Sequence, residues 1–401
     1  MSKRKDPSLQ EAPNAIVQTD CSLQDNPFPR MLVGTEHEYS INDHDFKPLP
    51  INDQIIKQLT GDFHLEAPYG GIALGKELQK HVLEMRTMGP HTDLAKLETE
   101  MVQGMKAVND AMGGKYKFLG LGMHPLLNLV DTTFWDHEER EYFDEFHRVF
   151  DLNKHGWLNI QALQINFPYG NEPDFVRKFN RVRSLIPYLV AVTAASPFVE
   201  GQRTGNVDNR VLYYKENQKK IPLICNEIIP ERLSCIKDYE DIQERIYCEL
   251  RKEGAELLCN EWVNSRGVIV RFSRKCLEIK AMDEQDCIRA DLGVTAFVRG
   301  LLRAKDLELE QDRQALLDMN DEAVEKGTSA FRSELQKLYH IAYENAYKED
   351  LSYLPLVKRR IDEGCLGELM LKRGSDRKDI LGTMKDMAVS LRTNVPYFSP
   401  S

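Results

Sequence analysis

The 401-residue sequence lacks a long hydrophobic run. Its longest apolar stretch, residues 186–198, is interrupted by Pro187 and Pro197, so it falls short of the roughly 18 residues that a membrane-spanning helix needs. The N-terminus shows no charged start followed by an apolar core, which argues against a signal peptide. We therefore expect a cytoplasmic protein with no membrane partner.

Paired cysteines, basic blocks and phosphate-binding loops are also missing. The eight cysteines include no Cys-x-x-Cys pair, so we expect reduced thiols that pack as small hydrophobic groups, not a structural zinc site. Lys and Arg total 53 against 63 Asp and Glu, for a net charge of -10, which argues against a nucleic-acid partner. No Gly-x-x-x-x-Gly-Lys-Ser/Thr loop is present, which excludes a P-loop enzyme.

What the sequence does contain is a pair of acids in an apolar, strand-forming run, residues 34–39. Residues two apart on a strand point to the same face, so Glu36 and Glu38 project together while His37 points away and packs. Two like charges side by side on a sheet repel each other unless a cation lies between them.

Three other segments repeat this pattern of polar side chains two residues apart between apolar neighbours. They contribute Glu84 with Arg86, Gln164 with Asn166, and Glu278 with Lys280. The four segments together predict one sheet with an apolar face packed on helices and a polar face that holds metal.

The remaining periodicity predicts the organisation of the chain. Residues 1–29 are polar and interrupted by prolines, so we expect a disordered N-terminal arm, followed by a single α+β domain over 30–401 that is mostly helical from 290. Within that domain we expect strands at 31–41, 82–87, 116–123, 157–167 and, as a pair, 268–281. We expect helices at 93–112, with Asp93 as the N-cap, and at 136–149, 173–195 and 239–263.

Lined up in order, the short motifs resemble the glutamate–cysteine ligase family of carboxylate–amine ligases. The matching strings are Gly34-Thr35-Glu36-His37-Glu38, Leu83-Glu84-Met85-Arg86-Thr87, His124-Pro125, Leu163-Gln164-Ile165-Asn166, Ala195-Ser196-Pro197-Phe198-Val199-Glu200-Gly201, Thr204-Gly205 with Arg210, and Leu277-Glu278-Ile279-Lys280 with Asp283 and Gln285. The resemblance implies a fold similar to glutamine synthetase: a curved antiparallel sheet with helices on its outer face, MgATP at one end and an amino acid at the other.

Two positions depart from the family pattern. Many bacterial relatives carry a His-x-His pair where this chain has Ala162-Leu163-Gln164, and the Gln-x-Asn form resembles the plant and proteobacterial enzymes. Lys280 stands where an arginine is usual, and a lysine lacks the planar fork that binds two oxygens at once.

The chemistry of such a ligase assigns roles to these residues. A carboxylate is a poor electrophile, so phosphoryl transfer from ATP must first convert it to an acyl phosphate, with the charge neutralised by Mg²⁺ and by Arg or Lys. Mg²⁺, with Mn²⁺ as the alternative ion, prefers hard oxygen ligands. The candidate metal ligands are Glu36, Glu38, Glu84 and Glu278, although any one of them alone would be better explained as an ordinary solvent-facing strand residue.

The remaining roles also follow from the resemblance. The candidate catalytic residues are Glu36 and Arg210. The candidate substrate-binding residues are Arg86, Thr87, His124, Gln164, Asn166 and Arg203, and the candidate ATP-binding residues are Arg210, Arg271 and Lys280. Simpler interpretations remain open for five of them: Arg86 pairs with Glu84, His124 is structural, Arg271 is a surface base, and Gln164 and Asn166 are outward-facing polar residues of an alternating strand.

The leading hypothesis is an ATP-dependent carbon–nitrogen ligase that forms a γ-glutamyl-type amide from small-molecule substrates, by default glutamate and cysteine or another amine. One alternative is a phosphotransferase acting on a guanidino or carboxylate group on the same fold. Another is a non-catalytic sensor of amino acids or nucleotides. The substrates and a homo-oligomeric state stay open from sequence.

Overall fold

The computed structural model describes residues 30–225 and 227–398. The chain divides into two units, Met1–Met31 and Leu32–Ser401, and the second contains every element described below. The predicted arm at 1–29 lies outside the described residues. Among the helices of the described residues, none has both the length and the apolar character needed to cross a membrane.

The described residues form an eight-stranded sheet in which all pairings are antiparallel. The strand order is β2-β3-β4-β1-β6-β10-β9, and β5 also pairs with β1. The strands are β1 Gly34–Asn42, β2 Glu66–Tyr69, β3 Ile72–Lys76, β4 Val82–Thr87, β5 Lys117–Leu119, β6 Ala162–Pro168, β9 Val268–Arg271 and β10 Cys276–Asp283. A separate hairpin joins β7 Phe198–Val199 to β8 Gln202–Arg203. The antiparallel sheet predicted from sequence is confirmed.

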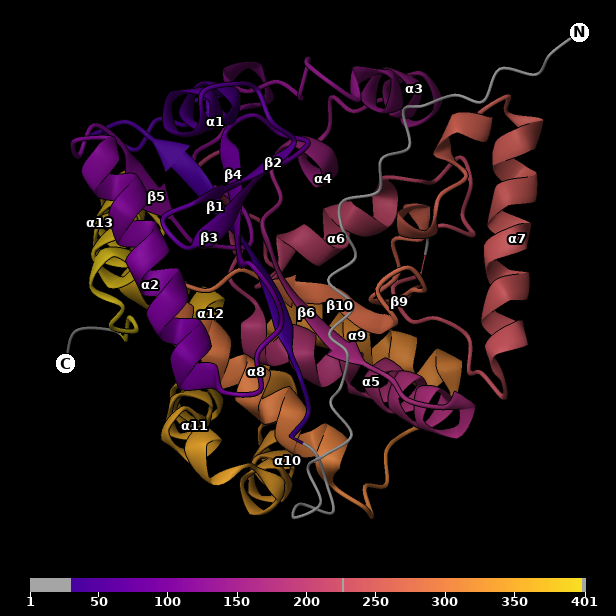
Figure 1. Ribbon diagram of the computed structural model, residues 1–401. Helices are drawn as coiled ribbons and strands as arrows, with labels where there is room; N and C mark the ends of the chain where they lie inside the picture. Colours follow the sequence, from indigo (N-terminus) through magenta and orange to yellow (C-terminus); the bar gives the residue numbers. More distant parts are fainter. Residues whose placement is uncertain (1–29, 226, 399–401) are drawn as a thin grey trace, which may run out of the picture. The chain divides into compact units, whose positions relative to one another are not determined.

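Helices lie between and after the strands, and they form the C-terminal part of the chain as predicted (Figure 1). The α-helices are α1 Asn52–Thr60, α2 Leu94–Ala111, α3 Arg140–Phe150, α4 His155–Leu158, α5 Glu172–Thr193, α6 Asn209–Glu216, α7 Ile236–Lys252, α8 Ile288–Arg303, α9 Arg313–Lys326, α10 Arg332–Asn345, α11 Leu354–Glu363, α12 Leu366–Arg373 and α13 Arg377–Thr393. The 3₁₀ turns are η1 Leu129–Asp131, η2 Glu256–Leu258, η3 Glu261–Val263, η4 Gly327–Ala330 and η5 Lys348–Ser352.

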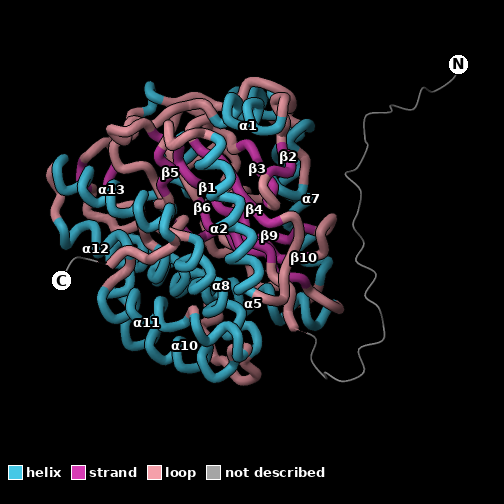
Figure 2. Tube along the Cα trace, turned by 60° about the vertical axis from the view of Figure 1, so that its left-hand side comes forward, coloured by secondary structure: helices cyan, strands magenta, loops and turns pink. Residues whose placement is uncertain are grey.

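The helices α2, α5 and α8 cover the apolar face of the sheet. α2 packs on β2, β3 and β4, α5 packs on β9 and β10, and α8 contacts both helices (Figure 2). The strand residues on this face, among them Tyr39, Met85, Leu163 and Ile279, are fully buried. Each such side chain contributes about 1.5–3 kcal/mol through burial, so this face anchors the sheet.

Local signals explain where several elements begin and end. Asp93 caps α2 by accepting a hydrogen bond from the N–H of Ala95 at 2.9 Å, as predicted. The helix expected to continue to residue 263 ends instead at Lys252, because Gly254 adopts a positive φ of 65° and two 3₁₀ turns follow. The strand expected from Trp157 begins only at Ala162, since Trp157 lies in α4. Its ring packs against the ring of Phe146, with the two ring centroids 5.5 Å apart. The strand expected at 116–123 is confined to β5.

A buried polar cluster lies behind β1, on the helix-covered face. The Nδ1–H of His37 donates to Asp291 of α8 at 3.2 Å, and its Nε2–H donates to Thr35 at 2.9 Å. Burial opposes the charge on the ring, but hydrogen bonds to Asp291 and Glu284 outweigh it and raise the pKa of His37 to about 10. Glu284 also accepts the backbone N–H of Glu38 at 2.9 Å. His37 therefore ties β1 to α8, on the face opposite Glu36 and Glu38.

The loop after β5 approaches the end of β10 closely at Gly122. A Cβ at this position would meet Asp283 Oδ2 at 2.0 Å. That oxygen already accepts hydrogen bonds from the N–H of Ala195 and the hydroxyl of Ser196, both at 2.8 Å, so it has no room to retreat without breaking them. The close approach requires glycine.

Gly122→Ala should therefore destabilise the protein by about 1–3 kcal/mol, because overpacking forces Asp283 away from its partners. Differential scanning calorimetry should show a fall in Tm of several degrees. Gly89→Ala is the matched control, since a Cβ there meets nothing within 4 Å. Equal Tm values for the two variants would contradict this reading of Gly122.

Candidate active site

The second face of the sheet carries acids, amides and bases, and it is called the polar face below. The register places Glu36 opposite Arg86 of β4 and Gln164 of β6. Residues on the polar face are Glu36, Glu38, Glu84, Arg86, Gln164, Asn166, Glu278 and Lys280, from four adjacent strands. The structure thus brings together the four polar pairs predicted from alternation.

The two amides of β6 hold the two acids of β1 in place. The side-chain N–H of Gln164 donates to Glu38 Oε1 at 2.8 Å, and that of Asn166 donates to Glu36 Oε1 at 3.2 Å. The other oxygen of Glu38 accepts the backbone N–H of Ala162 at 2.8 Å. Amides carry no charge, so they orient the carboxylates without neutralising them.

Burial and crowding disfavour ionisation of three of these carboxylates. Burial, then the charge of Glu278, raises the pKa of Glu36. Burial raises the pKa of Glu38 to about 7. Burial, followed by the charges of Glu36 and Glu77, holds the pKa of Glu84 well above its usual range. A bound cation would favour the ionised forms of these three carboxylates, which burial and crowding disfavour.

Glu278 behaves in the opposite way because two bases of the chain contact it. Arg271 lies 2.7 Å from Glu278 Oε2, and Lys280 lies 3.3 Å from Oε1. Burial would raise the pKa of Glu278, but the charges of Lys280 and Arg271 outweigh burial and lower it. Arg271 also binds Glu261 at 3.1 Å.

Arg210 lies beside the polar face at the end of β10. It sits in the first turn of α6, whose N-cap Asp208 accepts the N–H of Val211 at 2.8 Å. The guanidinium donates to the carbonyl of Lys280 at 2.8 Å and lies 3.5 Å from Asp283 Oδ1. Its charge also lowers the pKa of Glu38, against the larger effect of burial, so the guanidinium acts on the polar face electrostatically.

Two residues of this neighbourhood were missed by the sequence reasoning. Arg274, in the turn between β9 and β10, lies 3.0 Å from Glu36 Oε1 although 47% of its side chain is exposed. Glu77 follows β3, and burial, then the charge of Glu38, raises its pKa to about 8. Strand alternation misses both residues because neither lies in a strand. Their places near the acids become apparent only once β3 pairs with β4, and β9 with β10.

Three predicted substrate residues are not on the polar side of the four strands. Thr87 alternates to the other side of β4, and its hydroxyl donates to the carbonyl of Gly89 at 2.8 Å. His124 is fully buried, and its backbone N–H donates to Asn159 Oδ1 at 2.9 Å. Burial lowers the pKa of the His124 ring to about 4. Arg203 is exposed on β8.

Arg86 does lie on the polar face, but its partner differs from the one considered in the sequence analysis. Its Nε donates to Glu66 of β2 at 2.8 Å. The charge of Glu66 and the hydrogen bond to it, followed by the charge of Glu84, raise the pKa of Arg86 against burial. The guanidinium is thus held at the edge of the polar face by Glu66, which the register aligns with Glu84 through Gly75.

The predicted metal ligands do not form one tight group in this structure. Among the described residues, the groups of acids and histidines with ligand atoms within 4.8 Å of one another are His37-Glu284-Asp291 and Asp53-Asp136-His137. Neither contains a predicted ligand. Lys80 lies 2.7 Å from Asp53 and 3.0 Å from Asp136, so the second group already has a counterion.

The fold and the polar face together define a class of protein. A glutamate–cysteine ligase from Francisella tularensis, solved in complex with AMP, superimposes with a TM-score of 0.58 at 14% identity and covers 93% of this chain and 90% of its own. The antiparallel sheet with its covering helices is therefore similar in fold to that ligase.

The chain belongs to glutamate–cysteine ligase family 2, whose model matches residues 32–377. It is 46% identical over 368 residues to an uncharacterized protein of Archaeoglobus fulgidus, covering 91% of this chain and all of that one. It is 25% identical over 231 residues to the chloroplastic glutamate–cysteine ligase of Arabidopsis thaliana, covering 53% of this chain and 43% of that enzyme. Membership makes this protein a carbon–nitrogen ligase of an ATP- and divalent-cation-dependent family.

The ion pairs of Glu278 predict an asymmetry in stability. Glu278→Ala should cost about 3–5 kcal/mol, because it leaves the bases Arg271 and Lys280 without their buried partner. Glu66→Ala, which removes the 44%-exposed partner of Arg86, should cost about 1 kcal/mol or less. Urea unfolding followed by circular dichroism measures both, and similar midpoints for the two variants would contradict the buried-pair assignment.

Proposed function

We propose that the protein joins the γ-carboxylate of glutamate to an amine through an acyl phosphate, with cysteine as the default amine. The observation that carries the proposal is the row of buried acids on the polar face beside Arg210 and Lys280. Transfer of the γ-phosphoryl group of ATP to a carboxylate oxygen releases ADP. The amine then attacks the acyl carbon, and phosphate leaves with one former carboxylate oxygen.

The residues present fit a divalent cation, with Mg²⁺ favoured and Mn²⁺ as the alternative. Glu36, Glu38, Glu84 and Glu278 offer hard oxygen ligands, and a bound cation would favour the ionised forms of the first three, whose pKa values burial raises. These four residues would hold the ion, which when bound neutralises negative charge on the phosphates.

The bases of the chain supply the remaining positive charge. Arg210 is 2% exposed, and Lys280 is anchored on Glu278, so their charges are little screened by solvent and suit the phosphates of ATP. Arg271 supports the proposed phosphate-binding residues because its ion pair with Glu278 holds that carboxylate in place. Arg86 lies opposite Glu36, where it can bind a carboxylate of the amino-acid substrate. Thr87, His124 and Arg203 are left out of the proposed site.

Oxygen labelling tests this mechanism directly. The protein is incubated with MgATP, glutamate labelled with ¹⁸O in its γ-carboxylate, and a panel of amines that includes cysteine. One label should pass to inorganic phosphate for each amide formed, as read by mass spectrometry. A phosphorylated glutamate without amide would indicate a phosphotransferase, and pyrophosphate with labelled AMP would indicate adenylation. Unlabelled phosphate beside a genuine amide would refute the acyl phosphate.

Glu36→Gln tests the assignment of the metal ligands. It keeps the shape and hydrogen bonding of the side chain but deletes a charge, so cation affinity should drop and turnover should fall by about a hundredfold or more. Electron paramagnetic resonance of bound Mn²⁺ and ADP release measure the two effects. Glu216→Gln, at the C-terminal end of α6 and outside the proposed site, is the matched control. Near-normal turnover of the folded Glu36→Gln protein would sink the assignment.

A further inference from the structure

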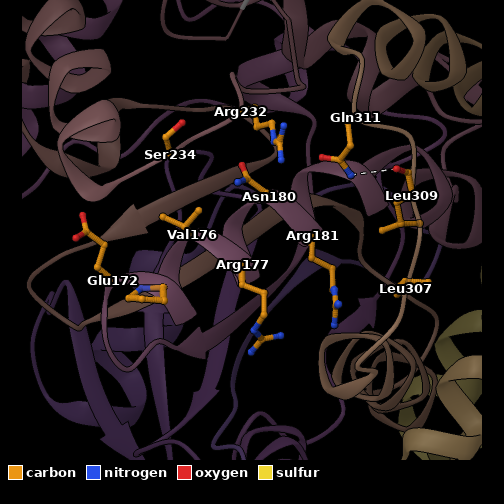
Figure 3. Close-up of a pocket in the computed structure, with 11 residues that line it drawn as sticks. Glu172, Val176, Arg177, Asn180, Arg181, Arg232, Ser234, Leu307, Leu309 and Gln311 are labelled. Carbon is orange, nitrogen blue, oxygen red and sulfur yellow. Dashed lines mark hydrogen bonds between the residues drawn. The ribbon is translucent and has the colours of Figure 1, made fainter.

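Two of the surface pockets outside the polar face that are lined by arginines or lysines differ in how those bases are used. The first, of about 590 Å³, lies between α5 and the segments 232–234 and 307–311 (Figure 3). Its Arg177 binds Asp174 at 2.6 Å, and its Arg181 donates to the carbonyls of Leu301 and Leu302 at 3.2 Å. In Figure 3 both side chains point away from Arg232. These arginines secure the end of α8, so the pocket offers little free charge.

The second pocket, called the α2–α13 pocket below, has a volume of about 740 Å³. It lies between the C-terminal end of α2, strand β5 and helix α13, which packs on β5. Its apolar lining includes the buried rings of Phe46 and Phe118 and the side chain of Val389, which is 47% exposed. This volume is within the range of small-molecule sites, which are typically about 300–1,000 Å³.

Three bases line the α2–α13 pocket: Lys117, Lys385 and Arg392. Within residues 30–225 and 227–398, the structure gives none of their charged groups an ion-pair or hydrogen-bond partner. The one acid in the lining, Asp110, is already paired with Lys106 of the same helix. A protein with a net charge of -10 thus concentrates uncompensated positive charge beside the half-buried ring of Tyr116 and the exposed side chain of Val389.

We propose that the α2–α13 pocket binds a small organic phosphate with an aromatic body. The compact ammonium groups of Lys117 and Lys385 suit the head group, since lysine acts on phosphate as a point charge, and Arg392 can bind two of its oxygens at once. The half-buried ring of Tyr116 and the exposed side chain of Val389, both in the lining, suit a flat apolar body. Both halves of the ligand are needed, because exposed bases alone hold an anion weakly in salt.

The α2–α13 pocket is separate from the polar face but adjoins the central strand. No residue proposed for the ligase site lines it. Its strand β5 pairs with Ser40, Ile41 and Asn42 of β1, beyond the acids Glu36 and Glu38. The proposal therefore stands or fails independently of the ligase reaction.

The test is ligand binding to the full chain, using 4-fluorophenyl phosphate as the probe in ¹⁹F NMR titrations. The probe should bind with saturation, whereas 4-fluorophenol, which lacks the phosphate, should bind at least about tenfold more weakly, as expected when a charge-assisted contact is lost. Inorganic phosphate should compete poorly, because it lacks the aromatic body. Equal competition by inorganic phosphate would overturn the proposal in favour of a simple anion site.

Variants locate the binding. Lys385→Glu and Val389→Glu, both on exposed positions of α13, should each weaken probe binding about tenfold or more. Lys96→Glu, which makes the same charge change on the exposed side of α2, should leave it unchanged. Arg210→Ala should also leave it unchanged, because that residue serves the polar face. Unaltered binding in Lys385→Glu and Val389→Glu, or loss of binding in Arg210→Ala, would refute this site.

Discussion

The constraint on which the structure depends is the burial of like charges on β1. Glu36 and Glu38 project to one side of the central strand, and burial raises the pKa of both. Isolated carboxylates in such a place would neutralise or pull the strand toward water. The neighbouring strands supply what these acids need: amides from β6, bases from β9 and β10, and the hydrogen-bonded frame of an antiparallel ladder.

The opposite side of β1 shows how that position is maintained. His37 is charged and fully buried between Asp291 and Glu284, and Glu284 also holds the backbone N–H of Glu38. A buried ion pair contributes little net stability, but it fixes geometry because breaking it is costly. Asp291 belongs to α8, so this contact helps to fix the position of β1, which carries the acids, relative to the helices.

The sequence was sufficient for the features that repeat along one strand. Alternation placed Glu84, Gln164 and Glu278 on the same face as the acids of β1 because a period of two is fixed by the backbone. It was insufficient where tertiary contact decides. Arg274 reaches Glu36 from a turn, and His124 is buried away from the polar face although it matches a family motif. Helix α7 ends at Lys252, before the expected residue 263, because Gly254 adopts a positive φ although the apolar pattern of the sequence continues.

Bases of the chain also pair with two acids of the polar face. Arg274 sits on Glu36, while Arg271 and Lys280 sit on Glu278, so the chain supplies its own counterions at two of the four acids. The two cases differ in depth: the side chain of Arg274 is 47% exposed, whereas those of Arg271 and Lys280 are 15% and 19% exposed. An exposed pair is worth about 0–1 kcal/mol and separates readily, but a buried one does not. A cation that binds to the polar face would therefore displace Arg274 from Glu36 more readily than it would displace Arg271 and Lys280 from Glu278.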